Sequence, residues 1–147
     1  PLPAKARCKP EKLDEAAAVF RRVLELEPEN FEAARLRGFS LMRLGRFEEA
    51  LQAFRTAEAG LPDDPRLLED TAMSYAELKD FDSAVRYFTR AVAVRPTAVL
   101  YANYALARAE TGDIAQASEL MRTAIGRPDA DAELISLAER YLIAWRK

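Results

Sequence analysis

The stretch DEAAAVFRRVLELEP (Asp14–Pro28) sets the pattern that the rest of the chain repeats. It returns as EEALQAFRTAEAGLP (Glu48–Pro62), as DSAVRYFTRAVAVRP (Asp82–Pro96) and, with more changes, as AQASELMRTAIGRP (Ala115–Pro128). A period of about 34 residues is the signature of a helical repeat array. The aligned positions, spaced 34, 34 and 33 residues apart, are Ala16, Ala50, Ala84 and Ala117, followed by Phe20, Phe54, Phe88 and Met121.

Each repeated stretch predicts a helix that ends at a proline. In the first stretch, Leu13, Ala16 and Phe20 lie at helical spacing, and Pro28 ends the helix because it removes a backbone donor. A second helical segment precedes each later stretch. Short turns join the two segments, and the sequence therefore predicts helix–turn–helix units with turns at Gly45–Arg46, Lys79–Asp80 and Gly112–Asp113.

The chain divides into a short arm and one repeat domain. Residues 1–10 (PLPAKARCKP) contain three prolines and no helical periodicity, so we expect an extended or disordered arm there. The domain covers residues 11–147. Its predicted sections are the second helix of an incomplete repeat (11–30), three repeats (31–64, 65–97 and 98–128) and a C-terminal capping helix (129–147).

These units resemble the tetratricopeptide repeat (TPR), a helix–turn–helix unit of about 34 residues. The resemblance implies an all-α fold, a right-handed solenoid of about three and a half repeats plus the capping helix. The aromatic residue expected early in the first helix is kept only at Tyr101. The matching residues are Gly38, Ala72 and Ala105 in the first helices, Ala50, Phe54, Ala57, Ala84, Phe88 and Ala91 in the second helices, and the closing Pro28, Pro62 and Pro96.

Composition excludes several classes of function. A net charge of −2 argues against a nucleic-acid-binding surface, and no apolar run approaches the roughly 20 residues that span a bilayer. The chain has no histidine, which removes Ser–His, Cys–His and imidazole–metal sites. We interpret acidic pairs such as Glu48–Glu49 and Glu69–Asp70 as solvated charges. We therefore expect no enzyme, no metal and no cofactor.

The resemblance implies a concave groove, lined by the first helices of successive repeats, that holds a peptide or helix of a partner protein. Its apolar floor and surrounding charges contain the residue types found at interface centres. Glu32, Val99 and Glu110 map to the same side. The predicted groove residues are Arg35, Phe39, Met42, Arg43, Arg66, Glu69, Asp70, Met73, Glu77, Asn103 and Leu106.

One group of tetratricopeptide domains clamps the acidic tails of heat-shock chaperones with Lys, Arg and Asn side chains. Of the five matching places, only Arg35 keeps a positive charge, and Asp70 would repel a carboxylate. We do not expect this chain to bind such tails. The matching places hold Arg35, Phe39, Asp70, Val99 and Asn103.

The sequence predicts a non-catalytic scaffold or adaptor, with two alternatives: a secretion-type chaperone, or a structural section of a longer array such as an envelope or polysaccharide-export protein. The incomplete first repeat would leave Leu13, Ala17 and Phe20 without a cover. The arm could fold over them, the chain could be cut from a longer array, or two chains could associate there. The compartment stays open between cytoplasm and, after removal of a signal peptide, periplasm.

Overall fold

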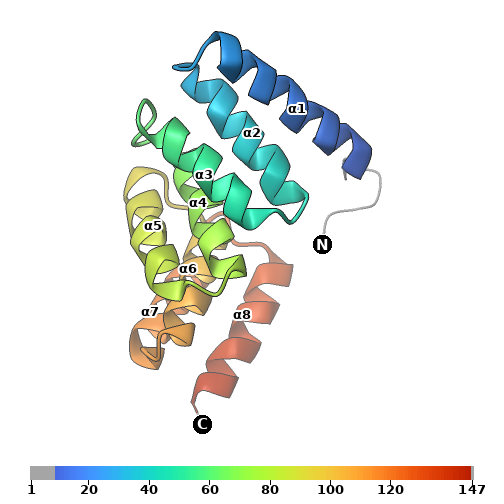
Figure 1. Ribbon diagram of the computed structural model, residues 1–147. Coiled ribbons are helices and arrows are strands. Elements are labelled where there is room, and N and C mark those ends of the chain that lie inside the picture. Colours follow the sequence, from blue (N-terminus) through green and yellow to red (C-terminus); the bar gives the residue numbers. More distant parts are fainter. Residues whose placement is uncertain (1–8, 147) are drawn as a thin grey trace. The chain divides into compact units, whose positions relative to one another are not determined.

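The computed structural model describes residues 9–146, which form eight α-helices and no strand (Figure 1). The predicted helix–turn–helix order is confirmed, and the predicted arm falls mostly on residues 1–8, outside the described part. The helices are α1 (Pro10–Leu26), α2 (Phe31–Arg43), α3 (Phe47–Glu58), α4 (Pro65–Glu77), α5 (Phe81–Val94), α6 (Ala98–Glu110), α7 (Ile114–Ile125) and α8 (Ala132–Trp145).

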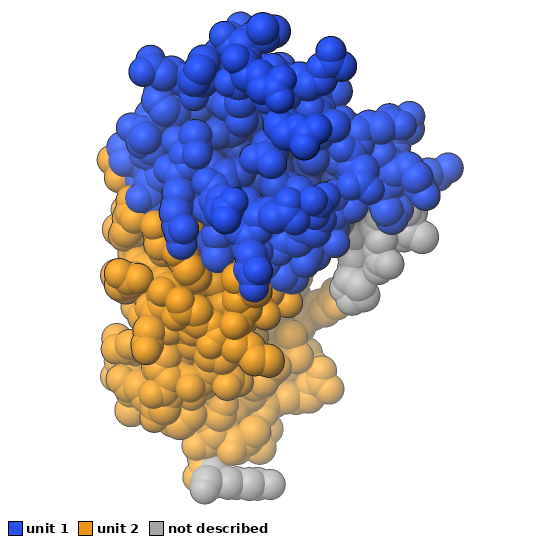
Figure 2. All heavy atoms as spheres, viewed as in Figure 1, with its two compact units in different colours: residues 1–62 blue, residues 63–147 orange. Residues whose placement is uncertain are grey.

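The chain divides into two compact units, Pro1–Pro62 and Asp63–Lys147 (Figure 2). In unit 1, α2 packs against both α1 and α3. In unit 2, α4 pairs with α5 and α6 pairs with α7, α5 packs on α6, and α8 packs on α7. The tight turns make each pair an antiparallel hairpin, which is the helical repeat unit that the sequence predicts (Figure 1).

Polar side chains fix the start of most helices. A cap of this kind satisfies a backbone N–H that has no partner within the helix. The turn inside each hairpin needs one residue in the left-handed region, which Gly45 and Gly112 supply with φ of 79° and 95° and Lys79 supplies with φ of 63°. The capping residues, each accepting a bond from a backbone N–H, are Asn30, Asp64, Asp80, Thr97, Asp113 and Asp131.

The repeated aromatic position forms the centre of each hairpin. Phe54 and Phe88 are 1% and 0% exposed, and Met121 takes the same place in the last hairpin. Gly38 of α2 lies directly against the Phe54 ring, since a Cβ added there would sit 2.4 Å from a ring carbon. The small residue therefore allows the close approach of the two helices that the large ring then fills.

The first helix is covered less completely than its counterparts. Phe20 is partly exposed, whereas its aligned partner Phe54 is buried. The expectation that Leu13 and Ala17 lack a cover is wrong, because α1 packs on α2 and these two side chains are only 8% and 7% exposed. Leu26 is the most exposed large apolar side chain of α1, with 86% of its surface accessible.

A loop anchored to the start of α6 sets the position of α8. The Asp129 carboxylate accepts a hydrogen bond of 2.8 Å from the backbone N–H of Ala98, and Arg127 donates to the carbonyl of Pro96 at 3.1 Å. The bond from Ala98, together with Arg127, holds the pKa of Asp129 below its ordinary value. Helix α8 then packs Ala138 into the core formed with α6 and α7, and leaves Tyr141 and Trp145 partly buried.

Candidate functional site

Unit 2 contains an open cavity of about 280 Å³ whose walls come mainly from α4, α6 and α8. A smaller cavity of about 60 Å³ continues it between α6 and α8, and the two share Asn103, Leu106 and Tyr141. We call the pair the α6 trough. The larger cavity is lined by Met73, Ala76, Phe81, Phe88, Asn103, Leu106, Ala107, Ala109, Glu110, Tyr141 and Trp145, and the smaller adds Val99, Ala102, Met121, Leu134, Leu137 and Ala138.

Helix α4 forms one wall, with Met73 facing the trough. Glu69 and Glu77 lie four residues before and after Met73, on the same face of the helix. The start of α4 is fixed by Asp64, which accepts hydrogen bonds from the backbone N–H groups of Arg66 and Leu67. Burial of Asp64 favours a higher pKa. The hydrogen bonds from the Arg66 guanidinium and from these two N–H groups outweigh it and hold the pKa below its ordinary value.

Helix α6 forms the floor. Val99, Asn103, Leu106 and Glu110 recur at intervals of four, three and four residues, so they follow one face of the helix. The Asn103 side chain is partly exposed and makes no hydrogen bond to any residue that the structure describes. Its amide therefore offers both a donor and an acceptor to a bound molecule.

Helix α8 supplies two aromatic rings to the wall of the larger cavity. Tyr141 and Trp145 are four residues apart and their ring centroids lie 5.6 Å from each other, tilted by 38°. Both line the larger cavity and both keep part of their surface exposed. Trp145 is the one tryptophan of the chain, which makes its fluorescence a direct reporter of the trough.

Three of the predicted groove residues, Met73, Asn103 and Leu106, are brought around this trough. The sequence predicted only a capping helix over residues 129–147 and did not include Tyr141 or Trp145 among the groove residues. Their signal was a pair of aromatics one turn apart. Elsewhere on α4, Asp70 is half-buried. Arg66 is exposed, and its guanidinium donates hydrogen bonds to the Asp64 carboxylate.

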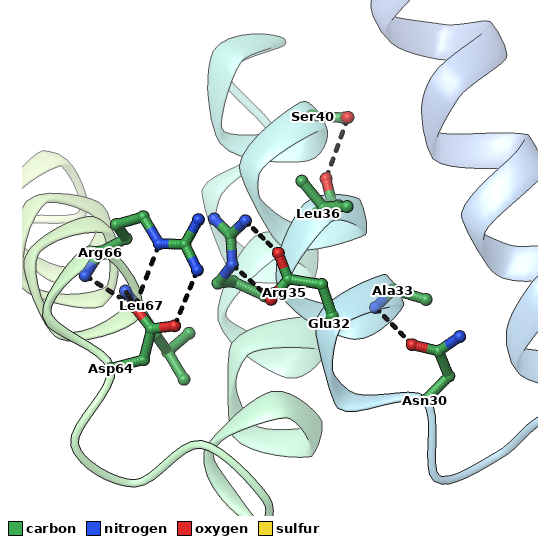
Figure 3. A network of polar contacts seen from close by, with 9 residues as sticks. All are labelled: Asn30, Glu32, Ala33, Arg35, Leu36, Ser40, Asp64, Arg66 and Leu67. Carbon is green, nitrogen blue, oxygen red and sulfur yellow. Dashed lines mark hydrogen bonds and ion pairs between the residues drawn. The ribbon is translucent and has the colours of Figure 1, made fainter.

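The predicted residues of α2 belong to unit 1. Arg35 is only 6% exposed, and its guanidinium donates to both carboxylate oxygens of Glu32, at 3.1 and 2.5 Å (Figure 3). The Arg43 guanidinium lies 5.9 Å from the centre of the half-buried Phe39 ring. Met42 is also half-buried. Arg35 thus has a partner within its own helix, whereas Arg43 and Phe39 remain accessible at the surface.

Unit 1 has a smaller and more polar cavity of about 190 Å³ between its three helices. Three of its charges pair with one another, because Arg46 donates to Glu49 at 2.7 Å and lies 3.6 Å from Asp14. The hydrogen-bonded Glu49 raises the pKa of Arg46, and Arg46 lowers the pKa of Glu49. Arg21 and Arg37 also line this cavity, which is therefore a charged site, whereas the α6 trough is largely apolar.

Two kinds of site are absent from the described part of the chain. No group of three or more Cys, His, Asp or Glu residues within residues 9–146 is placed to hold a metal ion. None of the helices α1–α8 is both long and apolar enough to cross a lipid bilayer.

The family model of the tetratricopeptide repeat matches residues 4–65 and 69–134. The chain belongs to this family. Tetratricopeptide repeats generally serve as non-catalytic modules for protein–protein interaction, which agrees with the coarse function that the sequence predicts. The matched residues include Met73, Asn103 and Leu106, whereas Tyr141 and Trp145 lie beyond the match.

Solved structures share the tetratricopeptide fold at low sequence identity. A crystal structure of MamA has a TM-score of 0.79 and 19% identity, and the match covers 90% of this chain and 81% of MamA. TTC0263, a thermophilic TPR protein of Thermus thermophilus, has a TM-score of 0.74 and 18% identity, with 90% of this chain and 74% of that protein covered. At such identities these structures support the fold alone.

One curated relative is similar over part of the chain. Bacteriophage adsorption protein A of Escherichia coli (strain K12) is 32% identical over 72 residues, which are 49% of this chain. The match spans only 7% of the length of that much larger protein. The similarity therefore concerns the repeats and does not carry the relative's activity to this chain.

Proposed function

We propose that this chain is a scaffold or adaptor module that holds a segment of a partner protein in the α6 trough. The observation that carries the proposal is the trough itself. It is an open, largely apolar cavity in which Met73, Leu106, Tyr141 and Trp145 converge from three helices. Aromatic and Met side chains are enriched at the centres of protein interfaces.

The dimensions of the trough fit a short peptide segment. Its floor runs along α6 from Val99 to Glu110, which at 1.5 Å per residue is about 16 Å. This length accommodates about five residues of an extended peptide or about three turns of a helix. The uncommitted Asn103 amide stands midway along the floor, where it would hydrogen-bond a partner's backbone or side chain.

Helix α8 gives this site a defined end. Its aromatic pair closes one side of the larger cavity, while exposed Leu137 extends the apolar surface beside the smaller one. The capping helix thus serves two purposes: it covers the last hairpin through Ala138 and adds binding surface to the trough.

The test is an unbiased selection of peptides followed by measured affinities. Peptides of about twelve residues, long enough to fill the trough, are selected from a displayed random library on the full chain. The selected peptides, made without Trp, are then titrated while Trp145 emission is recorded. Met73→Gln and Leu106→Asn introduce polarity at the site without charge. Val94→Thr, at an exposed position on α5 outside both cavities, is the matched control.

The proposal predicts that selected peptides change Trp145 emission. Each of the two site variants should weaken their binding about tenfold or more, which corresponds to loss of roughly 1.4 kcal/mol of apolar contact. Val94→Thr should bind as the parent does. Far-UV circular dichroism checks that each variant stays folded. Equal affinity of the parent and both site variants would remove the trough as the binding site.

A further inference from the structure

We propose that the segment held in the α6 trough is basic as well as apolar, with an apolar anchor side chain flanked by Lys or Arg. The inference rests on the proposed function and adds the chemistry of the partner to it. Three features of unit 2 support it: the charge of the trough, the place of two carboxylates at helix ends, and the aromatic pair.

The charge of the trough is of one sign. Among the described residues that line its two cavities, Glu110 is charged and there is no Lys or Arg. Glu69 and Glu77 stand on the face of α4 that carries Met73, one turn to either side. The basic residues close in sequence to the lining, among them Lys79, Arg108, Arg140 and Arg146, line neither cavity. An apolar site bordered by carboxylates favours a partner with positive charges at matching places.

Two of these carboxylates occupy positions that helix stability alone disfavours. Glu77 is the last residue of α4 and Glu110 is the last residue of α6. The C-terminal end of a helix carries partial negative charge, so a cation is stabilising there and an anion is not. In unit 1 the equivalent last residue of α2 is Arg43, which is the favourable choice.

Neither carboxylate is neutralised within the described part of the chain. Glu77 and Glu110 are exposed and form no ion pair with any described residue. The last turn of α4 contains no basic residue, and the basic residue in the last turn of α6, Arg108, has its guanidinium bonded to Gln116 and near Asp113. A cationic partner would supply the missing compensation at both helix ends.

The aromatic pair suits the same partner. The faces of Tyr and Trp rings attract Lys and Arg cations, and apolar stems of these side chains pack well on aromatic surface. Unit 2 already uses this contact internally, since Arg90 lies 5.0 Å from the centre of the Tyr87 ring. Tyr141 and Trp145 offer partly exposed rings in the cavity that Glu110 also lines, so a Lys or Arg side chain bound there has both a ring and a carboxylate available to it.

The test compares three synthetic peptides of about twelve residues, made without Trp. They share one pattern of Leu residues and carry Lys, Gln or Glu at the remaining positions. Each is titrated against the full chain with Trp145 emission as the signal, at about 50 mM and about 500 mM NaCl, because exposed charge pairs are screened over this range. Glu77→Gln and Glu110→Gln are the site variants. Glu119→Gln, an exposed carboxylate of α7 that lines neither cavity, is the matched control.

The inference predicts that the Lys peptide binds at least about fivefold more tightly than the Gln peptide at low salt. High salt should reduce this difference in affinity. Glu77→Gln and Glu110→Gln should each weaken the Lys peptide about two- to fivefold, the range for solvent-exposed charge pairs. These two variants should leave the affinity for the Gln peptide unchanged. Glu119→Gln should change the affinity for neither the Lys nor the Gln peptide.

Two results overturn the inference in different ways. If the Gln or Glu peptide binds as tightly as the Lys peptide and is still weakened by Met73→Gln, the trough binds peptides but not for their positive charge. If the Lys peptide binds without sensitivity to Met73→Gln, or if neither these peptides nor library-selected ones bind, the proposed function fails together with the inference.

Discussion

The repeat pattern places Phe54 and Phe20 in the same register, yet the structure buries them differently, and this difference predicts unequal costs of truncation. Phe54 is 1% exposed and lies against Gly38, in a space that the surrounding helices cannot easily refill. Burial of a Phe side chain is worth about 1.5–3 kcal/mol, and the cavity left behind adds to the loss. We expect Phe54→Ala to lower the free energy of unfolding by about 3–5 kcal/mol.

Phe20 occupies the same place on α1, but part of its ring is exposed. Truncation removes less buried surface there and leaves no closed cavity, so we expect Phe20→Ala to cost only about 1–2 kcal/mol. Both residues belong to unit 1, so urea unfolding followed by far-UV circular dichroism compares them within one compact unit.

Equal losses for the two variants would refute this reasoning, because they would mean that Phe20 is covered as fully as Phe54 in solution. A loss below about 1 kcal/mol for Phe54→Ala would refute the assignment of the aromatic position to the core.

Three further predictions concern the turns and close approaches. Gly38→Ala should destabilise the parent by about 1–3 kcal/mol in a urea melt, because the new Cβ meets the Phe54 ring. In a Phe54→Ala background the same substitution should instead raise the free energy of unfolding by about 0.5–1 kcal/mol, because Ala favours the helix more than Gly does. A loss of stability in both backgrounds would contradict the contact between Gly38 and the Phe54 ring. Lys79→Gly should stabilise by about 0.5–1 kcal/mol in thermal or urea unfolding, because Lys79 has a φ of 63°; a loss would contradict this. Asp129→Asn should lower the urea midpoint at pH 7, where the charged carboxylate accepts the Ala98 N–H. Because the pKa of Asp129 is lowered in the fold, this difference should shrink as the pH falls below the ordinary value of 3.8 and vanish below the lowered pKa of the folded protein. A difference that persists at that low pH would exclude the carboxylate as its source.

Much of the fold follows from local patterns in the sequence. Prolines such as Pro28, the 34-residue spacing of Phe54 and Phe88, and the capping Asp131 each act through contacts with near neighbours in the chain. Such signals can be read one helix at a time. They predicted the order of the helices and the register of the repeated aromatic residue.

The site was harder to predict because it depends on how helices meet. Helical phase placed Met73 and Leu106 on faces that line one cavity, but could not reveal that Tyr141 and Trp145 of the capping helix join the same cavity. Helical phase also could not show that Arg35 is unavailable to a partner, because its guanidinium is hydrogen-bonded to Glu32 within the same helix. Both outcomes depend on tertiary packing and on rotamers.

The assignment of partner binding to the α6 trough is tested most directly by mapping amide chemical-shift changes in the 15N-labelled full chain as a library-selected peptide is added. The account predicts that the largest changes fall on the trough faces of α4, α6 and α8, around Met73, Asn103, Leu106 and Trp145. Changes centred instead on α1, or on exposed faces of α5 and α7, with the trough unaffected, would contradict it.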